Sequence, residues 1–264
     1  MNKIKFLGTA GARFVVMRQL RASGGIWLTL DDTNVMIDPG PGSLVKCLSS
    51  RPKLDPGELD GIILTHRHID HSNDVNIMIE AMTNGGFKKR GIVFAPSDAL
   101  EDDPVILKYS RNHVERIEKL REKGEYKIGN ISFSSPIRHQ HGVETYGLNI
   151  CGKDITISII TDTRYFNGIE SFYPGDILII NLVLLKESEK IEHLSLPEAE
   201  KIFTSNKPRL GILTHFGMTM IRAKPWEIAQ QLSEKTGLEI VAASDGMQID
   251  IDQYKRKKDK NALL

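Results

Sequence analysis

The sequence predicts an α/β protein, because short apolar runs of strand length alternate along the chain with segments of helical periodicity. Residues 155–160 form one such run and are rich in β-branched side chains, which favour strands. Residues 225–236 instead repeat their apolar positions with the period of an amphipathic helix. A third observation is the dense cluster of histidine and aspartate at residues 66–71, directly after an apolar run.

Composition limits the classes of function. The chain has 264 residues, of which 40% are hydrophobic and 26% charged, enough for one large core. Its formal net charge of +1 provides no overall field that would attract nucleic acid. The two cysteines, Cys47 and Cys151, lack the spacing of a metal clip and suit a reducing compartment. With no signal peptide and no apolar run of about 18 residues, we expect a cytoplasmic protein without a membrane partner.

The N-terminal half is expected to contain several strands and helices. We predict strands at residues 3–7, 26–30, 34–37, 62–64 and 92–95, and helices at 43–50, 74–82 and 99–123. The last of these helices carries many charges, and we consider that it could cover the site and set specificity. Arg18 and Arg21, which follow a small-residue loop at 8–13, could contact an anion, although solvated loop charges are the simpler interpretation.

The C-terminal half continues the alternation. We predict strands at residues 126–133, 146–150, 155–160, 176–185, 210–215 and 239–242, and helices that open near 195 and at 225. Ser195 can cap its helix, with Glu198 in the capping-box position. We therefore expect one domain over residues 1–254. Residues 255–264 form a basic tail, for which a frayed, solvated end is a simpler interpretation than an RNA-binding arm.

The stretch at residues 65–71, Thr-His-Arg-His-Ile-Asp-His, is the most informative in the chain. Imidazole and carboxylate groups are the usual ligands of Zn²⁺ and its first-row neighbours. His66 and His68 alternate, so an extended or turning backbone points both in one direction. Asp70 and His71 follow at the expected start of a helix, where they can address a second ion. So short a stretch cannot easily give four ligands to one tetrahedral ion, and it therefore predicts a two-metal site.

Residues 66–71 match the H-x-H-x-D-H signature at every position, and on this motif the sequence resembles the metallo-β-lactamase superfamily. The resemblance implies a four-layer α/β/β/α sandwich with the site at one edge of two sheets. Two further segments resemble the branch that holds ribonuclease Z and the small cyclic phosphodiesterases. These are the Leu-Gly-Thr-x-Gly opening at residues 7–11 and the His-x-Ser…Glu-Ala segment at 193–199.

The same resemblance implies a role for particular residues. One ion would be bound by His66, His68 and His141, the other by Asp70, His71 and His215, with Asp162 between them. Asp38 would orient the metal site through hydrogen bonds, and His139 would line the pocket, where it could contact substrate, or be buried. The expected cofactors are two divalent ions, Zn²⁺ first, with Mn²⁺ or iron as alternatives.

The first hypothesis for function is a dinuclear-metal-dependent phosphodiesterase acting on a small or cyclic phosphodiester. A metal-bridging hydroxide would attack phosphorus, Asp70 would aim it, and His193 would protonate the leaving group or contact the transition state. A ribonuclease Z-like RNA endonuclease is the alternative. The near-neutral charge and the short segment between His141 and Asp162, with little room for a tRNA-clasping arm, both count against it.

Other classes remain open to different degrees. A lactone, thioester or β-lactam hydrolase would use the same hydroxide. Flavodiiron oxidoreductases generally have Glu where His68 stands, so that class is disfavoured. A metal-binding module without catalysis would not need an open coordination position or His193. A homodimer is expected from the resemblance alone.

Overall fold

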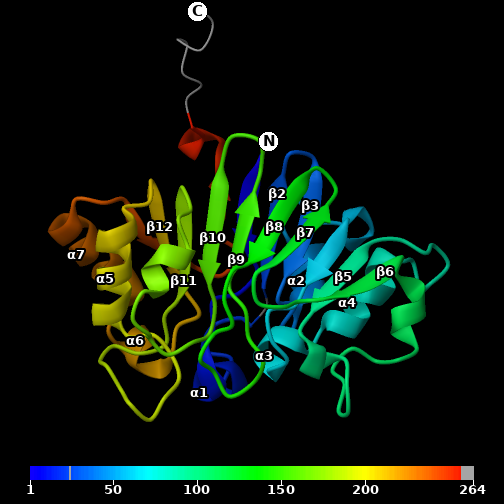
Figure 1. Cartoon of the computed structure of the whole chain (residues 1–264), viewed down its shortest axis with the longest axis horizontal. Coiled ribbons are helices and arrows are strands. Elements are labelled where there is room, and N and C mark those ends of the chain that lie inside the picture. Colours follow the sequence, from blue (N-terminus) through cyan, green and yellow to red (C-terminus); the bar gives the residue numbers. More distant parts are fainter. Residues whose placement is uncertain (24, 257–264) are drawn as a thin grey trace, which may run out of the picture.

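The computed structural model describes residues 1–23 and 25–256. Two seven-stranded sheets pack face to face, and helices cover both outer faces (Figure 1). This is the four-layer α/β/β/α sandwich that the sequence resemblance implied, and the fold prediction is confirmed. None of the helices in the described ranges combines the length and apolarity that crossing a membrane requires.

The first sheet joins an antiparallel half to a parallel half. Its strands, in spatial order, are β14 (Gln248–Asp250), β1 (Lys3–Phe6), β2 (Ile26–Leu30), β3 (Thr33–Ile37), β4 (Gly61–Ile63), β5 (Ile92–Ala95) and β6 (Arg116–Lys119). Strands β3 to β6 are parallel, so they end at one common edge. Helices α2 (Ser43–Ser49) and α4 (Val75–Met82) supply the crossovers that parallel strands require.

The second sheet repeats this division. Its order is β13 (Ile240–Ala242), β12 (Leu210–Thr214), β11 (Ile177–Asn181), β10 (Thr156–Ile160), β9 (Leu148–Cys151), β8 (Ile131–Ser135) and β7 (Gly124–Ile128). Strands β10 to β13 are parallel. Helices α5 (Leu196–Asn206) and α7 (Pro225–Thr236) cover its outer face, while the short helices α1 (Ala12–Met17), α3 (Ile69–Ser72) and α6 (Met218–Arg222) lie along the lower edge in Figure 1.

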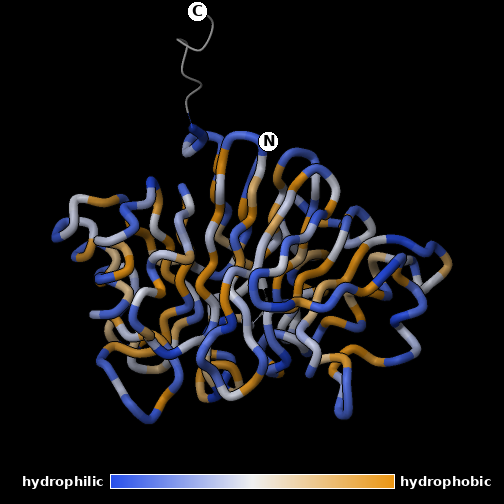
Figure 2. Tube along the Cα trace, in the orientation of Figure 1, coloured by the Kyte–Doolittle hydropathy of each residue, from blue (hydrophilic) through white to orange (hydrophobic). Residues whose placement is uncertain are grey.

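Three hydrophobic clusters hold these layers together, and the apolar segments follow the strands (Figure 2). The central cluster lies between the sheets and includes Phe6, Phe94 and Phe133, all at most 2% exposed. A second joins the first sheet to α2 and α4, and a third joins the second sheet to α5 and α7. Because the sheets are fixed against each other, the strand ends of one sheet face those of the other at a constant distance.

Most predicted elements are found, and the helix at 225–236 has the predicted bounds. The capping box before α5 is also present: the Ser195 backbone N–H donates to Glu198 Oε2 at 2.7 Å. The predicted strand at 126–133 is instead a hairpin of β7 and β8 that turns at Gly129, whose φ is +52°. The strand predicted at 176–185 ends at Asn181.

The prediction of a helix at residues 99–123 was wrong. The segment begins at the end of a 3₁₀ turn, Ser97–Ala99, and then contains a second 3₁₀ turn, Ser110–His113, and the edge strand β6. Pro104 disfavours helical backbone at Asp103, which interrupts the pattern. Because β6 pairs with β5, the second half of this segment is part of the sheet and cannot move as a separate cover.

The C-terminal tail is described only at its start, where Arg256 Nε donates to Asp176 Oδ2 at 3.0 Å. The rest of the predicted basic tail, residues 257–264, lies outside the described residues. The division into a domain at 1–254 and a tail at 255–264 therefore stays a prediction.

Candidate metal centre

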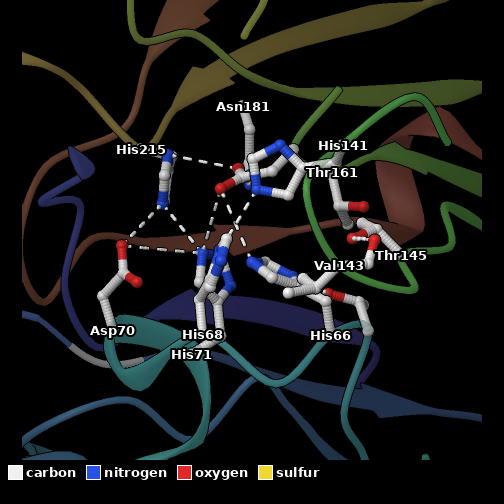
Figure 3. A network of polar contacts seen from close by, with 12 residues as sticks. His66, His68, Asp70, His71, His141, Val143, Thr145, Thr161, Asn181 and His215 are labelled. Atoms are coloured by element: carbon white, nitrogen blue, oxygen red, sulfur yellow. Dashed lines mark hydrogen bonds and ion pairs between the residues drawn. The ribbon is translucent and has the colours of Figure 1, made fainter. Parts of the chain in front are cut away.

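Histidine and aspartate side chains from both sheets meet at the edge where the parallel strands end. Asp38 follows β3, the His66 to His71 segment follows β4, Asp162 follows β10 and His215 follows β12. His141 comes from the loop between β8 and β9. Figure 3 shows the labelled histidines and Asp70 pointing toward one another from separate elements. Residues far apart in sequence are thus collected at one point, as is usual at the carboxyl ends of parallel strands.

The first group consists of His66, His68, His141 and Asp162, whose candidate ligand atoms all lie within 4.8 Å of one another. His68 Nδ1 is 3.1 Å from His141 Nε2, and His66 Nε2 is 3.6 Å from Asp162 Oδ2. Ligand atoms of a tetrahedral ion with bonds of about 2.0–2.1 Å lie roughly 3.3 Å apart. These separations therefore fit a single ion held by all four residues.

The second group consists of Asp70, His71 and His215. His71 Nε2 is 2.9 Å from His215 Nε2, and His215 Nε2 is 3.5 Å from Asp70 Oδ2. A cavity of about 40 Å³ adjoins all three residues. The separations again match those of ligands around one small cation.

Asp162 lies between the two groups. Its Oδ2 is 3.6 Å from His66 Nε2 in the first group and 3.5 Å from His71 Nε2 in the second. Its other oxygen, Oδ1, accepts a hydrogen bond from Asn181 Nδ2 at 2.8 Å. One carboxylate oxygen is therefore anchored to the protein, and the other lies near ligand atoms of both groups.

Asp38 contacts the second group through His71. Its carboxylate accepts hydrogen bonds from the Thr65 backbone N–H and Thr65 Oγ1, both at 2.7 Å, and lies 3.0 Å from His71 Nδ1. A carboxylate accepts only, so His71 donates from Nδ1, and Nε2 is the nitrogen that faces the site and would bind an ion. The orienting role that the sequence resemblance implied for Asp38 stays a prediction, and this contact supports it.

The electrostatics of the cluster favour bound cations. Burial opposes charge on Asp162, yet the surrounding His215, His193 and His71 hold the pKa of its carboxyl well below its usual range. Burial likewise opposes charge on His71, but nearby carboxylates, Asp162 first, raise its pKa well above its usual value. The cluster thus gathers carboxylates that need positive charge beside them.

An atom without a hydrogen-bond partner in the described part of the chain, His66 Nε2, also indicates a metal site. Burial lowers the pKa of His66 well below its usual range, so its ring is neutral. His66 Nε2 is buried without a hydrogen-bond partner among the described residues. A neutral imidazole nitrogen with no partner, 3.6 Å from a carboxylate, fits a metal ligand. Without a metal ion, burying this nitrogen unpaired would cost free energy of folding. The residues present therefore fit two divalent ions.

His193 borders the cluster on its open side. Its Nδ1 lies 3.7 Å from Asp162 Oδ2, and its side chain is 15% exposed. Burial lowers the pKa of His193 to about 4, which leaves the ring neutral at pH 7. The ring also lines a hollow of about 700 Å³, together with Arg164, Tyr165, Glu187, Ser188, Glu189 and Glu198. His193 is thus the residue shared by the metal centre and the space beside it.

Three residues predicted as possible substrate contacts do not line the hollow beside His193. Arg18 is exposed after α1. Arg21 Nη1 donates to Thr9 Oγ1 and to the Ala243 carbonyl oxygen, so its guanidinium stabilises the loop at residues 8–13. His139 is only 3% exposed and contacts Tyr173 and the backbone of Asp162. Of the two interpretations of His139, the structure agrees with the buried one, because its ring nitrogens contact Tyr173 and the Asp162 backbone.

Sequence reasoning missed a charged group at the mouth of the site. Arg164 Nη2 lies 3.0 Å from Glu192 Oε1, while the Glu192 carbonyl oxygen lies 3.0 Å from His141 Nδ1. A carbonyl only accepts, so His141 donates from Nδ1 and presents Nε2 to His68. The position of Arg164, two residues after Asp162, was the available signal. Asn181 and Tyr173 carried no signal, because their contacts arise only in the folded chain.

Comparison with known proteins places these observations in a family. The family model described as "Beta-lactamase superfamily domain" matches residues 33–216. An uncharacterized protein of Methanocaldococcus jannaschii is 27% identical over 264 residues, which is 97% of each chain. Ribonuclease Z of Bacillus cereus is 26% identical over 201 residues, which cover 73% of this chain and 62% of that enzyme.

Solved structures show the same fold at low sequence identity. The metallo-β-lactamase fold protein YhfI of Bacillus subtilis has a TM-score of 0.78, with 18% identity over 94% of this chain and 98% of that one. A diphosphatase from the PhnP family has a TM-score of 0.69, with 19% identity over 95% and 98% of the two chains. The short form of human tRNase Z has a TM-score of 0.67, with 17% identity over 94% and 99%.

Proposed function

The chain belongs to the β-lactamase superfamily domain family and is a metal-dependent hydrolase, and we propose that it cleaves a small or cyclic phosphodiester at two divalent ions. The observation that carries this proposal is the position of Asp162 Oδ2, 3.6 Å from His66 Nε2 and 3.5 Å from His71 Nε2, with His193 on the open side. The ribonuclease Z relatives and the diphosphatase structure, by their names, support phosphorus rather than carbonyl chemistry.

The proposed ligands divide as the two groups do. One ion would be held by His66, His68 and His141, the other by Asp70, His71 and His215, with Asp162 shared. Bound there, two ions would supply an attacking hydroxide near neutral pH and positive charge for the phosphoryl oxygens. Zn²⁺ suits these nitrogen and oxygen ligands, and Mn²⁺ or iron would also be accepted.

The chain's own residues provide orientation and a proton. Asp38 keeps His71 in the tautomer that leaves Nε2 free for an ion. Asp70 can accept a hydrogen bond from the nucleophilic water and aim it at phosphorus. His193, neutral in the free protein, donates a hydrogen bond to a phosphoryl or leaving oxygen. Transfer of a proton from His193 requires that the negative charge of the bound diester raises its pKa.

The hollow beside His193 favours a small substrate. Its volume of about 700 Å³ falls within the range of small-molecule pockets, roughly 300–1,000 Å³. It is lined by Glu187, Glu189 and Glu198 but by one cation, Arg164, which is paired with Glu192. This lining, like the net charge of +1, lacks the positive charge that binding of an RNA backbone requires. The leaving alcohol of a small diester would occupy this space.

The test is hydrolysis of bis(p-nitrophenyl) phosphate by metal-loaded protein, beside a phosphomonoester, a lactone and a β-lactam. We expect the diester to be the best substrate and its cleavage to stop with chelator. Replacing His193 by Ala should lower the rate about 10²–10⁴-fold, as loss of a general acid does. His113→Ala is the control, because His113 pairs with Glu80 outside the metal centre. Turnover of the carbonyl substrates alone would refute the phosphodiesterase proposal.

A further inference from the structure

A buried histidine and a buried tyrosine lie directly behind the metal centre, and the proposed mechanism uses neither. His139 Nε2 is 2.5 Å from Tyr173 Oη. His139 Nδ1 is 3.3 Å from the Asp162 carbonyl oxygen and 3.3 Å from Thr161 Oγ1. His139 is 3% exposed and Tyr173 is fully buried. Two polar side chains without solvent therefore form a continuous connection to the backbone of Asp162.

The partners determine where the protons of this connection lie. The Asp162 carbonyl oxygen only accepts, and the Thr161 hydroxyl already donates to the Tyr146 carbonyl oxygen at 2.9 Å. His139 Nδ1 must therefore carry the hydrogen and donate it. The Tyr173 hydroxyl lies 2.5 Å from the other ring nitrogen, Nε2, and its oxygen accepts from the Gly147 backbone N–H. The hydroxyl hydrogen is therefore directed to Nε2, which is the acceptor.

Tyr173 is itself fixed at both ends. Burial raises the pKa of its hydroxyl, and a hydrogen bond from the Gly147 backbone opposes that rise, as donation to the hydroxyl oxygen does. A Cβ at Gly147 would lie 2.4 Å from Tyr173 Oη, so only glycine allows this approach. The Tyr173 carbonyl oxygen accepts from Asn206 Nδ2 at 2.6 Å, which ties the residue to the end of α5.

We propose that Tyr173 and His139 are positioning residues that hold Asp162 in its place between the two ions. Tyr173 fixes the tautomer of His139, and His139 Nδ1–H holds the Asp162 carbonyl. Asn181 holds Oδ1 of the same residue, so both the backbone and one carboxylate oxygen of Asp162 are restrained. The remaining oxygen, Oδ2, is thereby kept between His66 and His71. This inference rests on the proposed function, because it assigns Asp162 to metal binding.

The expected effect is on metal affinity. Removing the Tyr173 hydroxyl frees His139 to place its proton on Nε2, which would turn a bare Nδ1 toward a carbonyl oxygen and displace Asp162. Loss of a partner that orients a ligand typically weakens metal binding about 10–100-fold. Tyr173→Phe should show a loss of that size, together with a changed coordination geometry.

The test uses Co²⁺ as the probe, with affinity measured by competition against a chromophoric chelator and geometry by the visible absorption of bound Co²⁺. Tyr126→Phe is the matched control, because Tyr126 is also a buried tyrosine whose hydroxyl is hydrogen-bonded, to Arg121 N and the Lys119 carbonyl, away from Asp162. We expect the affinity and spectrum to change in Tyr173→Phe only. Equal values in Tyr173→Phe and wild type would overturn the proposal.

A second pair of variants tests whether the Nδ1–H donor of His139 is needed, or only the volume of its side chain. His139→Asn keeps an N–H near the position of Nδ1, whereas His139→Leu keeps only bulk. We expect His139→Asn to retain most of the Co²⁺ affinity and His139→Leu to lose it, and equal losses would contradict the proposal. None of these readouts depends on hydrolysis. If the wild-type protein bound no Co²⁺, the proposed function would fail first, and a normal Co²⁺ site unaffected by these variants would refute the positioning role alone.

Discussion

Asp162 shows at the residue scale why this cluster suits divalent cations. Its side chain is 2% exposed, and Asp38 and Asp70 lie close by with limited exposure. Taking a carboxylate out of water costs several kcal/mol unless positive charge compensates it. The imidazoles around Asp162 can provide part of that charge by protonation, which the carboxylates favour at His71 and burial opposes at His66. Two divalent ions would compensate the carboxylates and leave the imidazoles neutral.

The two cysteines provide a prediction with a defined pH dependence. Cys47 is buried and Cys151 exposed. Burial, followed by the charge of Asp74, raises the pKa of Cys47 from 9.0 to about 12. Because the folded pKa is raised, Cys47 stays protonated at pH 8, and its contribution to stability is complete below pH 9 and lost as the pH rises through about 12. Titration with a thiol reagent at pH 8 should find one reactive thiol in the native protein and two in denaturant. Two reactive thiols in the native protein would contradict this.

The place of the candidate site could be predicted where several ligand-type residues are close together in the sequence. The choice between neighbouring histidines depends on orientation, which the sequence does not give. The segment from His66 to His71 predicts a metal site by itself, and the fold brings Asp162 and His215 to it from the ends of other strands. His139 and His141 are of the same type and lie two residues apart. The sequence favoured His141 as the ligand and left open whether His139 lines the pocket or is buried. Orientation separates them: His141 faces His68 at 3.1 Å, and His139 faces Tyr173.

At the scale of elements, the predictions succeeded where a periodic pattern was long or a strand was buried. The helix α7 and the strand β10 are examples. The failure at residues 99–123 has a physical cause, because β6 is the edge strand of its sheet and carries the charged residues Arg116, Glu118 and Lys119. Edge strands are commonly charged, which removes the apolar alternation by which strands are recognised.

Arg67 connects this mispredicted segment to the metal centre. It stands between His66 and His68, and its guanidinium donates to the Asp98 carbonyl at 3.2 Å and the Asp103 carbonyl at 2.9 Å. Replacing Arg67 by Met should make backbone amides in residues 99–106 exchange with deuterium about tenfold faster, since the lost hydrogen bonds contribute about 1–2 kcal/mol.

The control for this experiment is Arg116→Met, because the pair between Arg116 and Glu118 is largely exposed and contributes little. Exchange in residues 99–106 should not change in that variant. Unchanged exchange in Arg67→Met would instead mean that Glu144, which accepts from the backbone N–H groups of Ser97 and Asp98, is sufficient to hold the segment.

At the scale of the whole molecule, the metal centre lies on the seam between the two sheets. The first sheet and its loops provide Asp38 and the His66 to His71 segment, and the second provides Asp162 and His215. Ions bound there would connect the two halves of the sandwich, so metal binding would add to the stability of the fold. The predicted homodimer and cytoplasmic location stay predictions.

The central claim is that the two groups of residues hold two ions with Asp162 between them. The most direct measurement is anomalous X-ray diffraction at the zinc edge from crystals of the zinc-loaded protein. We expect two anomalous peaks about 3.5–4 Å apart, one beside His66, His68 and His141 and the other beside Asp70, His71 and His215. A single peak at full occupancy, or zinc bound away from these residues, would contradict it.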